Sequence, residues 1–480
     1  MAYKHGVYMS EIPTSILPPV ETEAGLPVIY GTAPVHLASD RAKANRPVLC
    51  YSYAEAVAAF GYSNDWKNYT LCEAIYSEFA LFNVSPVVLV NVLDPETHKK
   101  VVSNTAVPVT NGVAKVTDPA LIETLVVSSG DKTLTAGEDY EAAYDDKEVL
   151  NITALSGGKM ESLDTISVSY TALDPSKVKA DDIIGGISTD GTSKGLETLD
   201  QVFPLFRMVP GLVLAPGWSQ HPEVAAVMAS KAGNINSHFK ALALVDVPTD
   251  TVTKYTDVPA WKNDNNYTNE NEVAFWPCVK LGEKVYHLST QMAGVCGQVD
   301  AAHDDIPYKS PSNESLQADG LCLTDGTEII LSNDQANYLN GQGIVTGLNF
   351  IGGWKLWGNR TACYPGNTDS KDAFISIRRM FNWHWQTFIQ TYWSRVDAPI
   401  NKRLIQTIVD SENIRLNGLV AQGAILGGRV TFESSENPTT SLIDGKIKFH
   451  TYFTPPTPAR EIEDELEYDP DYFSTLFENA

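Results

Sequence analysis

Alternating strand and helix patterns run along two long stretches of the chain. The apolar runs PVIYGTAP and PVVLVNVL predict buried strands, and two amphipathic segments, SYAEAVAAFG and TLCEAIYSEFALF, lie between them. Ser52 with Glu55, and Thr70 with Glu73, predict a capping box at the start of each helix. The alternation returns in GLVLAP, HPEVAAVMASKAGNI and ALALVDVP, with Pro222 at a first helical position. This order predicts a parallel sheet flanked by helices.

A different pattern fills residues 101–175. Helical periodicity disappears, and short alternating runs such as TLVVSS and TISVSYTAL are separated by glycine-containing turns. Because the helix and strand alternation resumes afterwards, we expect a small β domain inserted into one α/β domain.

Two long helices are predicted near the C-terminus. The segment FISIRRMFNWHWQTFIQTYW carries an apolar stripe and begins around Phe374. The segment APINKRLIQTIVDSENIRLNG follows, with Pro399 near its predicted start and Gly418 beyond its predicted end.

The end of the chain alternates with period two. Every second residue from 461 to 467 is a glutamate, and the positions between them include Ile462, Leu466 and Tyr468. This spacing predicts a strand with four carboxylates on one face. Such a strand orders only when it is added to an existing sheet, either in its own chain or in another copy. The prolines of TPPTP, which precede it, predict a stiff extended spacer.

An extended arm is also predicted at the N-terminus, where SEIPTSILPPVETEAGLP holds four prolines. The patterns therefore divide the chain into five parts. These are an N-terminal arm (1–25), an α/β domain (26–100 and 176–370), the inserted β domain (101–175), an α+β C-terminal domain (371–453) and a C-terminal linker and strand arm (454–480).

Charge is distributed unevenly. The formal net charge of -24 opposes general binding to nucleic acid or anionic lipid. Residues 371–450 nevertheless carry ten Lys or Arg against seven Asp or Glu, whereas residues 451–480 carry one Arg against eight acids. The tail of one copy could therefore meet the basic module of another, and ordinary solvated charge is the alternative. No apolar run is long enough for a membrane span, and no signal-peptide pattern is recognised at the start.

Cysteine and histidine spacings give no metal or disulfide pattern. The six cysteines form no close pair and no Cys-x-x-Cys, so buried free thiols are expected. Cys296 with His303 and Asp304 has no spacing that specifies a thiol-histidine site. His384, between two tryptophans on an apolar helix, is expected to pack or to face a partner.

Glycine-rich and serine-containing loops give no catalytic or nucleotide-binding motif. Ser193 in DGTSKG has no assignable histidine or carboxylate partner. GGWKLWG holds Lys355 without the Gly-Lys-Ser/Thr ending of a P-loop, and NGQGIVTG lacks the third glycine of a dinucleotide turn. The sequence therefore predicts no cofactor and no enzyme.

Six separated segments resemble the tail sheath proteins of contractile bacteriophages and phage-tail-like bacteriocins. In chain order they are GVYMSEIP, DDIIGG, YKSPSN, LNGQGIVT, WGNRTA and FISIRRMFNW. The combination of WGNRT with the following RRM helix is the most specific. The resemblance implies a subtilisin-like α/β core that serves as a scaffold without proteolysis, an inserted β-sandwich domain and an α+β assembly domain.

The same resemblance implies a structural function. Sheath subunits polymerise helically around an inner tail tube and contract to drive that tube through a target cell envelope. The implied partners are other copies of the chain, the tube protein, the baseplate and the tail terminator, with no nucleic acid and no direct membrane insertion. The implied location is a virion or phage-tail-like particle that assembles in the cytoplasm of a bacterial host.

Two sets of residues are candidates for assembly. Terminal strands would be shared between copies through Val7 and Tyr8 at the start of the chain and through Ile462, Leu466 and Tyr468 at its end. The candidate tube-facing residues are Lys402, Arg403, Arg415, Arg429, Lys446 and Lys448. Ordinary surface charge is the alternative for this second set.

Two other classes of function are weaker. A hydrolase would need a nucleophile and a base, and no such pair is readable. A non-catalytic surface-layer or adhesin protein would need an export signal, and none is recognised.

Overall fold

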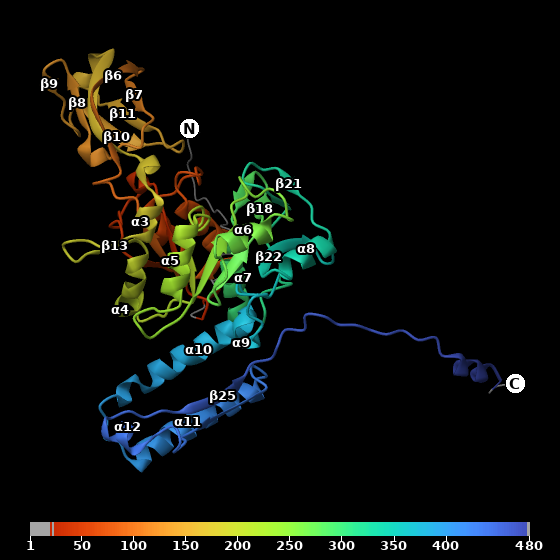
Figure 1. Ribbon diagram of the computed structural model, residues 1–480. Helices are drawn as coiled ribbons and strands as arrows, with labels where there is room; N and C mark the ends of the chain where they lie inside the picture. The colour runs from red at the N-terminus through yellow and green to blue at the C-terminus, as the bar shows by residue number, and fades with distance from the viewer. Residues whose placement is uncertain (1–19, 22–23, 478–480) are drawn as a thin grey trace, which may run out of the picture.

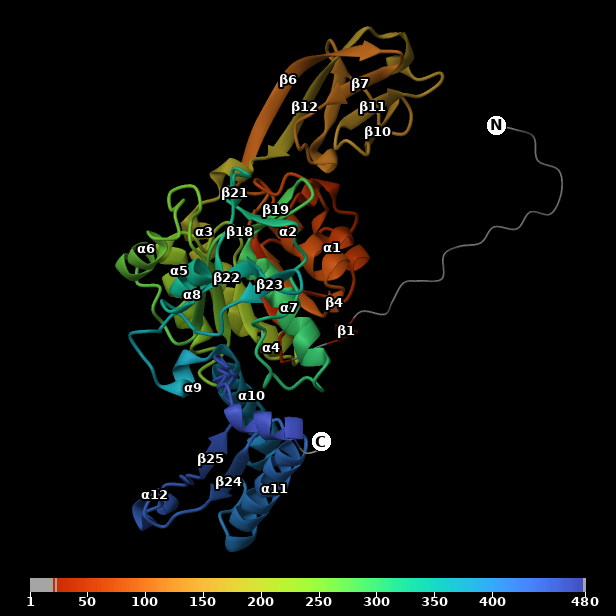
Figure 2. The same cartoon turned by 90° about the vertical axis from the view of Figure 1, so that its right-hand side faces the viewer.

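The computed structural model describes residues 20–21 and 24–477, and its parts follow one another along a long axis (Figures 1 and 2). An all-β part lies at one end, an α/β part in the middle and a helical module with a hairpin at the other end. The C-terminal tail leaves this module as an extended segment. Val7 and Tyr8 lie outside the described residues.

The middle part is built on a sheet of eight strands in the order β23-β22-β17-β16-β15-β2-β5-β3. The six inner strands run parallel, and β3 and β23 pair antiparallel at the two edges. Strand residues such as Val28 and Leu244 are fully buried, as expected when helices cover both faces. The strands are β2 (Pro27–Gly31), β3 (Val48–Cys50), β5 (Val87–Asn91), β15 (Leu212–Leu214), β16 (Leu242–Asp246), β17 (Glu272–Phe275), β22 (Ile344–Asn349) and β23 (Trp354–Trp357).

Helices pack on this sheet, and two of the three predicted helix starts are confirmed. Ser52 accepts a hydrogen bond from the Glu55 N–H, and Pro222 occupies the first turn of its helix, as predicted. The capping box predicted at Thr70 and Glu73 is wrong, because Thr70 makes no side-chain cap and Glu73 turns toward His287. The helices are α1 (Tyr53–Phe60), α2 (Leu71–Ile75) with a π-helical continuation (Tyr76–Leu81), α3 (Ala180–Ile184), α4 (Val202–Phe206), α5 (Pro222–Ala232), α6 (Val258–Asp264), α7 (Leu288–Ala301) and α8 (Asn333–Asn340).

Seven strands between β5 and α3 form a separate antiparallel arrangement in the order β10-β11-β7-β6-β12-β8-β9. The long strand β6 pairs with β12 over most of its length and with β7 at its end, and Val127, Ile152 and Val168 lie in a core of their own. The strands are β6 (Lys99–Thr110), β7 (Val113–Val116), β8 (Val126–Ser129), β9 (Lys132–Thr133), β10 (Tyr140–Tyr144), β11 (Leu150–Ala154) and β12 (Thr165–Leu173).

Short sheets and single turns complete the body. The short strands are β1 (Val20–Glu21), β4 (Val84–Ser85), β13 (Gly186–Ile187), β14 (Ser193–Lys194), β18 (Cys278–Leu281), β19 (Lys284–Tyr286), β20 (Gly320–Cys322) and β21 (Glu328–Ile329). The 3-10 turns are Val35–Leu37, Ile122–Thr124, Lys159–Ser162, Pro175–Lys177, Gly195–Gln201, Trp393–Arg395 and Pro470–Phe477. All six cysteines are buried and free, which confirms the expectation of buried thiols.

The C-terminal module contains α9 (Ser370–Ala373), α10 (Ile375–Tyr392), α11 (Lys402–Ala421), β24 (Gly427–Thr431), α12 (Thr439–Ile443) and β25 (His450–Thr454). The predicted end of the second long helix is wrong, whereas Pro399 lies near its start as predicted. The helix begins after Asn401, whose side chain accepts a hydrogen bond from the Leu404 N–H, and it runs through Gly418. The turn that ends it contains Gly423 in the left-handed conformation, at φ 77°.

Candidate assembly interface

A β-hairpin and the helix α11 form the outer half of the C-terminal module. β24 and β25 pair antiparallel, with Val430 opposite Thr451 and Gly428 opposite Phe453. A Cβ at Gly428 would lie 3.2 Å from side-chain atoms of Leu416, so glycine lets the hairpin approach the helix closely. The apolar core here consists of Ile306, Met380, Leu416, Leu419, Ala424, Ile425 and Val430.

The edge of β24 that faces away from β25 is blocked by one side chain of α11. Asn413 accepts a hydrogen bond from the Val430 N–H at 2.9 Å and donates its amide to the Val430 carbonyl at 3.1 Å. The amide group of Asn413 thus takes the place that a neighbouring strand would occupy at this position. Strand addition directly at Val430 is therefore prevented.

The outer edge of β25 is open in the described residues, because its sheet contains only β24 and β25. The main-chain groups of Val430 point to Asn413 and not to β25. Val430 therefore forms a non-hydrogen-bonded pair with Thr451. By the alternation of an antiparallel ladder, Gly428 and Phe453 form another such pair. The N–H and C=O groups of Thr451 and Phe453 therefore point away from β24, in the position of an unfilled sheet edge.

A mainly apolar groove of about 610 Å³ follows β24 toward the start of α11. It is lined by Ile400, Asn401, Lys402, Ile405, Gln406, Val409, Val430, Thr431 and Phe432. This groove borders β24 beside the position that Asn413 blocks at Val430.

A stacked polar layer supports the inner face of the hairpin. His384 of α10 stacks on Phe453 with 4.8 Å between ring centroids, and its Nδ1 lies 2.6 Å from the Arg415 guanidinium. Arg415 also pairs with the buried carboxylate of Glu412 at 2.7 Å. Burial and the charge of Arg415 lower the pKa of His384 to about 4, so the ring accepts a hydrogen bond as a neutral imidazole. His384 is thus packed, which was one of its two expected roles.

The six candidate tube-facing cations differ in their local contacts. Lys402 and Arg403 are exposed at the start of α11, whereas Lys446 and Lys448 pair with Asp444 and Glu436 beyond α12. Arg429 lies over the ring of Tyr452 at 3.8 Å. Arg415 contacts Glu412 and His384 within the module, and its role at the tube stays a prediction.

The C-terminal arm has no regular secondary structure from Pro455 to Asp469. Ile462, Leu466 and Tyr468 are 89 %, 95 % and 75 % exposed. Figure 1 shows the arm running away from the body. The predicted strand is therefore not formed in the single chain, and its apolar face contacts nothing that could bury it there.

The root of the N-terminal arm is fixed by two contacts. The N–H of Ala24 donates to both carboxylate oxygens of Asp305, at 2.9 and 3.0 Å. β1 pairs parallel with β4, with Val20 opposite Val84. Asp305 follows α7, and the same helix holds Asp300, whose carboxylate binds the guanidinium of Arg379 in α10. Both the N-terminal arm and the C-terminal module are thus attached at one end of α7.

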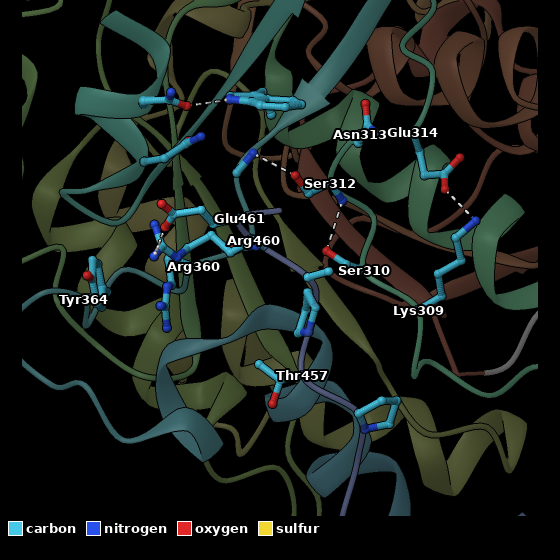
Figure 3. A pocket seen from close by; sticks show the side chains of 18 of the residues that line it. Lys309, Ser310, Ser312, Asn313, Glu314, Arg360, Tyr364, Thr457, Arg460 and Glu461 are labelled. Carbon is cyan, nitrogen blue, oxygen red and sulfur yellow. Dashed lines mark hydrogen bonds and ion pairs between the residues drawn. The ribbon is translucent and has the colours of Figure 1, made fainter. Parts of the chain in front are cut away.

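The proline-rich spacer crosses a groove of about 890 Å³ on the α/β part (Figure 3). The groove is lined by parts of YKSPSN, LNGQG and WGNR, three of the segments that carried the family resemblance, and by residues 456–461. Arg360 of WGNR lies over the rings of Tyr364 and Phe374, at 4.4 and 3.7 Å from their centroids. The sequence motifs thus meet where the spacer leaves the body, a role that their order in the chain did not indicate.

A buried polar cluster lies at the carboxyl ends of the central strands. His287 Nδ1 lies 2.8 Å from Glu73, and Asp246 accepts hydrogen bonds from the hydroxyls of Ser219 and Ser289. Burial alone would lower the pKa of His287, but the charge and hydrogen bond of Glu73, with Asp246, raise it to about 9. These side chains line neither the groove of about 890 Å³ nor the groove of about 610 Å³. The cluster is therefore arranged as a closed ionic network.

The other candidates from the sequence are separate from one another. Ser193 belongs to the β13–β14 hairpin, and Lys355 donates to the Ser315 hydroxyl at 2.9 Å. Cys296 is fully buried, and His303 contacts the Val299 carbonyl at 2.7 Å. Within residues 20–21 and 24–477, no group of His, Cys, Asp or Glu could hold a metal ion, and no helix has the length and hydropathy of a membrane span.

Two functional features were missed by the sequence reasoning. Nothing in the pattern of α11 distinguishes Asn413 from an ordinary exposed asparagine, since its role depends on the hairpin that follows. The RRM segment was noticed, but its second arginine could not be paired with Asp300 from sequence spacing alone.

No family model matches the chain. Proteins of known sequence nevertheless resemble it along its whole length. The chain is 29 % identical to the tail sheath protein of Burkholderia phage BcepMu, over 99 % of this chain and 98 % of that protein. It is 26 % identical to a putative prophage major tail sheath protein of Pseudomonas aeruginosa strain UCBPP-PA14, over 66 % of this chain and 79 % of that protein.

Solved structures share the fold over almost the full length. A chain of the anti-feeding prophage baseplate matches with a TM-score of 0.59 at 15 % identity, covering 98 % of this chain and 100 % of the other. A chain of the sheath complex of an extracellular contractile injection system, PVC, in its contracted state matches with a TM-score of 0.56 at 14 % identity, covering 98 % and 99 %. The chain is therefore similar over its full length to tail sheath proteins, and it shares the fold of chains from contractile baseplate and sheath assemblies.

Proposed function

We propose that the chain is the structural subunit of a contractile tail sheath. Copies polymerise helically around an inner tail tube, and the lattice contracts to drive the tube through a target cell envelope. The partners are other copies of the chain, the tube protein, the baseplate and the tail terminator, in a virion or phage-tail-like particle assembled in the cytoplasm of the bacterial host. The α/β part, of subtilisin-like type, serves as a scaffold without catalysis, and no cofactor takes part.

One observation carries the assembly mechanism: the open edge of β25 and an exposed strand-forming arm occur in the same chain. Ile462, Leu466 and Tyr468 of one copy would add beside Thr451 and Phe453 of a neighbour. Val7 and Tyr8 would add to the same module from a second neighbour. Each added backbone hydrogen bond contributes about 0.5–1.5 kcal/mol, so several bonds and the buried side chains together can hold copies in register.

This attachment allows the bodies to move without separating. The spacer before the arm contains Pro455, Pro456 and Pro458, and these residues keep it extended. The globular part of each copy can then rotate as a rigid body between an extended and a contracted lattice while the arms stay paired. A kinetically trapped extended lattice stores the free energy that a trigger at the baseplate releases. Lys402 and Arg403 are exposed polar candidates for the tube contact.

The test is negative-stain electron microscopy of four purified proteins. The full chain should form hollow tubes or rings at high concentration, whereas a chain without residues 456–480 should stay monomeric. Thr451→Pro removes the outward N–H of β25 and should also prevent tubes, while Thr451→Val keeps that N–H and should allow them. Normal tubes from the truncated chain would show that the C-terminal arm does not link the copies.

A further inference from the structure

A second apolar pocket lies between the α/β part and the C-terminal module. Its volume is about 360 Å³, and Phe203, Phe239, Ile389 and Trp393 form its apolar walls. Phe203 and Phe239 contact each other at 4.8 Å between centroids, and Trp393 packs edge-on against His238 at 5.2 Å. A cavity of roughly 150 Å³ lined by apolar side chains holds benzene. This pocket therefore has room for two aromatic rings.

The walls of the pocket are held in place from both sides. Trp385 of α10 donates its indole N–H to the His238 carbonyl at 2.7 Å, and Gln386 donates to the Lys240 carbonyl at 2.7 Å. These bonds join α10 to the loop that follows α5. The rim stays exposed, since Trp393 is 59 % exposed and the lining residue Pro204 of α4 is also exposed. A preformed apolar pocket with exposed aromatic edges is typical of a docking site.

The charge around the pocket is positive. Arg207 and His238 line it and are exposed, Arg395 follows Trp393, and Lys240 lies over the Trp385 ring at 5.0 Å. Asp200 accepts a hydrogen bond from the N–H of the lining residue Asn236. A segment that combines aromatic and acidic side chains would complement this surface.

The C-terminal end of the chain has that composition. Residues 468–477 read YDPDYFSTLF and contain no Lys or Arg. They end in the turn Pro470–Phe477, where Phe473 is 55 % exposed. The fifteen residues between Thr454 and Pro470 span about 50 Å when extended. In Figure 1 this tail leaves on the side opposite α4 and the end of α10, so it extends away from the pocket of its own chain.

We propose that the aromatic segment 470–477 of one copy docks in the pocket between α4 and α10 of a second copy. The contact is head-to-tail, as an open helical assembly requires. This docking contact rests on the proposed function, because it requires neighbouring copies. It adds a second attachment between copies beyond the strand at 461–468. Phe473 enters between Phe203 and Trp393, and Asp469 and Asp471 face Arg207 and Arg395.

Cross-linking in assembled full-length protein tests this contact. The native thiols are buried, so Glu467→Cys in one preparation and Gln390→Cys in another provide single reactive sites for a bismaleimide. Mixed tubes should give covalent dimers with Gln390→Cys and none with a control, Ile330→Cys, which is exposed near β21. Tubes without the Gln390 dimer would overturn the docking proposal and leave the proposed function standing, because microscopy of the same sample reports assembly separately.

A second measurement does not depend on tubes. Full-length Glu467→Cys carrying a fluorescent dye is titrated with unlabelled full-length chain, and its anisotropy is recorded. Trp393→Glu in the unlabelled chain should weaken binding at least tenfold, whereas Ile330→Glu should leave it unchanged. Equal affinities for the wild-type chain and Trp393→Glu would contradict the proposal, and circular dichroism checks that both variants are folded.

Discussion

Removing one partner of the ion pair between Asp300 and Arg379 should destabilise the junction between α7 and α10. The pair is bidentate, with 3.0 Å between Nη1 and Oδ1, and the side chains are 0 % and 3 % exposed. Neither charge can be solvated by water once its partner is lost. Breaking a buried pair of this kind costs about 3–5 kcal/mol.

The two single substitutions should differ in their pH dependence. Arg379→Met leaves a carboxylate whose pKa burial already raises, so protonation at low pH relieves part of the cost. Asp300→Asn leaves a guanidinium that cannot lose its proton, so its cost of about 3–5 kcal/mol persists at both pH 5 and pH 7. The double variant Asp300→Leu with Arg379→Met removes both charges and should recover most of the lost stability.

Urea unfolding at pH 5 and pH 7, followed by circular dichroism and by fluorescence of the tryptophans of α10, measures these differences. The control is Lys309→Met, which removes an ion pair whose side chains are 45 % and 33 % exposed. That substitution should cost about 0–1 kcal/mol. If Asp300→Asn costs no more than Lys309→Met, the pair does not hold the module to the body and the reasoning is refuted.

Three further predictions concern single side chains. Burial raises the pKa of Glu78 well above its ordinary value, so the folded state keeps a proton that the unfolded state loses, and stability falls by about 1.4 kcal/mol per pH unit above the unfolded pKa. Glu78→Gln should remove this slope in thermal unfolding between pH 5 and 7. The pKa of His287 is raised to about 9, so its stabilisation is complete below about pH 6.5 and is lost as the pH rises to 9, and His287→Gln should abolish that decline. Asn413→Ala leaves the buried main chain of Val430 unpaired and should cost about 1–3 kcal/mol in urea unfolding, whereas the exposed Asn417→Ala should cost less than half a kcal/mol, about the usual surface effect.

Local signals in the sequence identified the elements that depend on local chemistry. The Ser52 cap, Pro222 in the first turn of α5 and the buried runs of β2 and β5 follow from propensity and hydrophobic period. Glu73 shows the limit of this approach. Its spacing from Thr70 fits a capping box, but a charged partner in a distant segment, His287, offers a stronger interaction, and the carboxylate turns toward it.

The end of α11 could not be chosen from sequence alone. Gly418 and Gly423 both follow an apolar stripe, and a glycine inside a helix costs only about 1 kcal/mol relative to alanine. Packing of Leu416 and Leu419 against the hairpin offsets that cost, so the helix continues to Ala421.

The assembly interface could likewise be predicted only in part from the sequence. The alternation at 461–468 predicts a strand, but the edge that would receive it exists only after β24 and β25 pair and Asn413 blocks one side.

Helical reconstruction by cryo-electron microscopy of tubes formed by the full chain would test the central claim most directly. The account predicts that residues 461–468 of one copy lie as a strand beside β25 of another, with main-chain hydrogen bonds to Thr451 and Phe453. If the arm instead folds onto β25 of its own copy, or if the edge of β25 stays unpaired in an ordered tube, assembly by shared strands is contradicted.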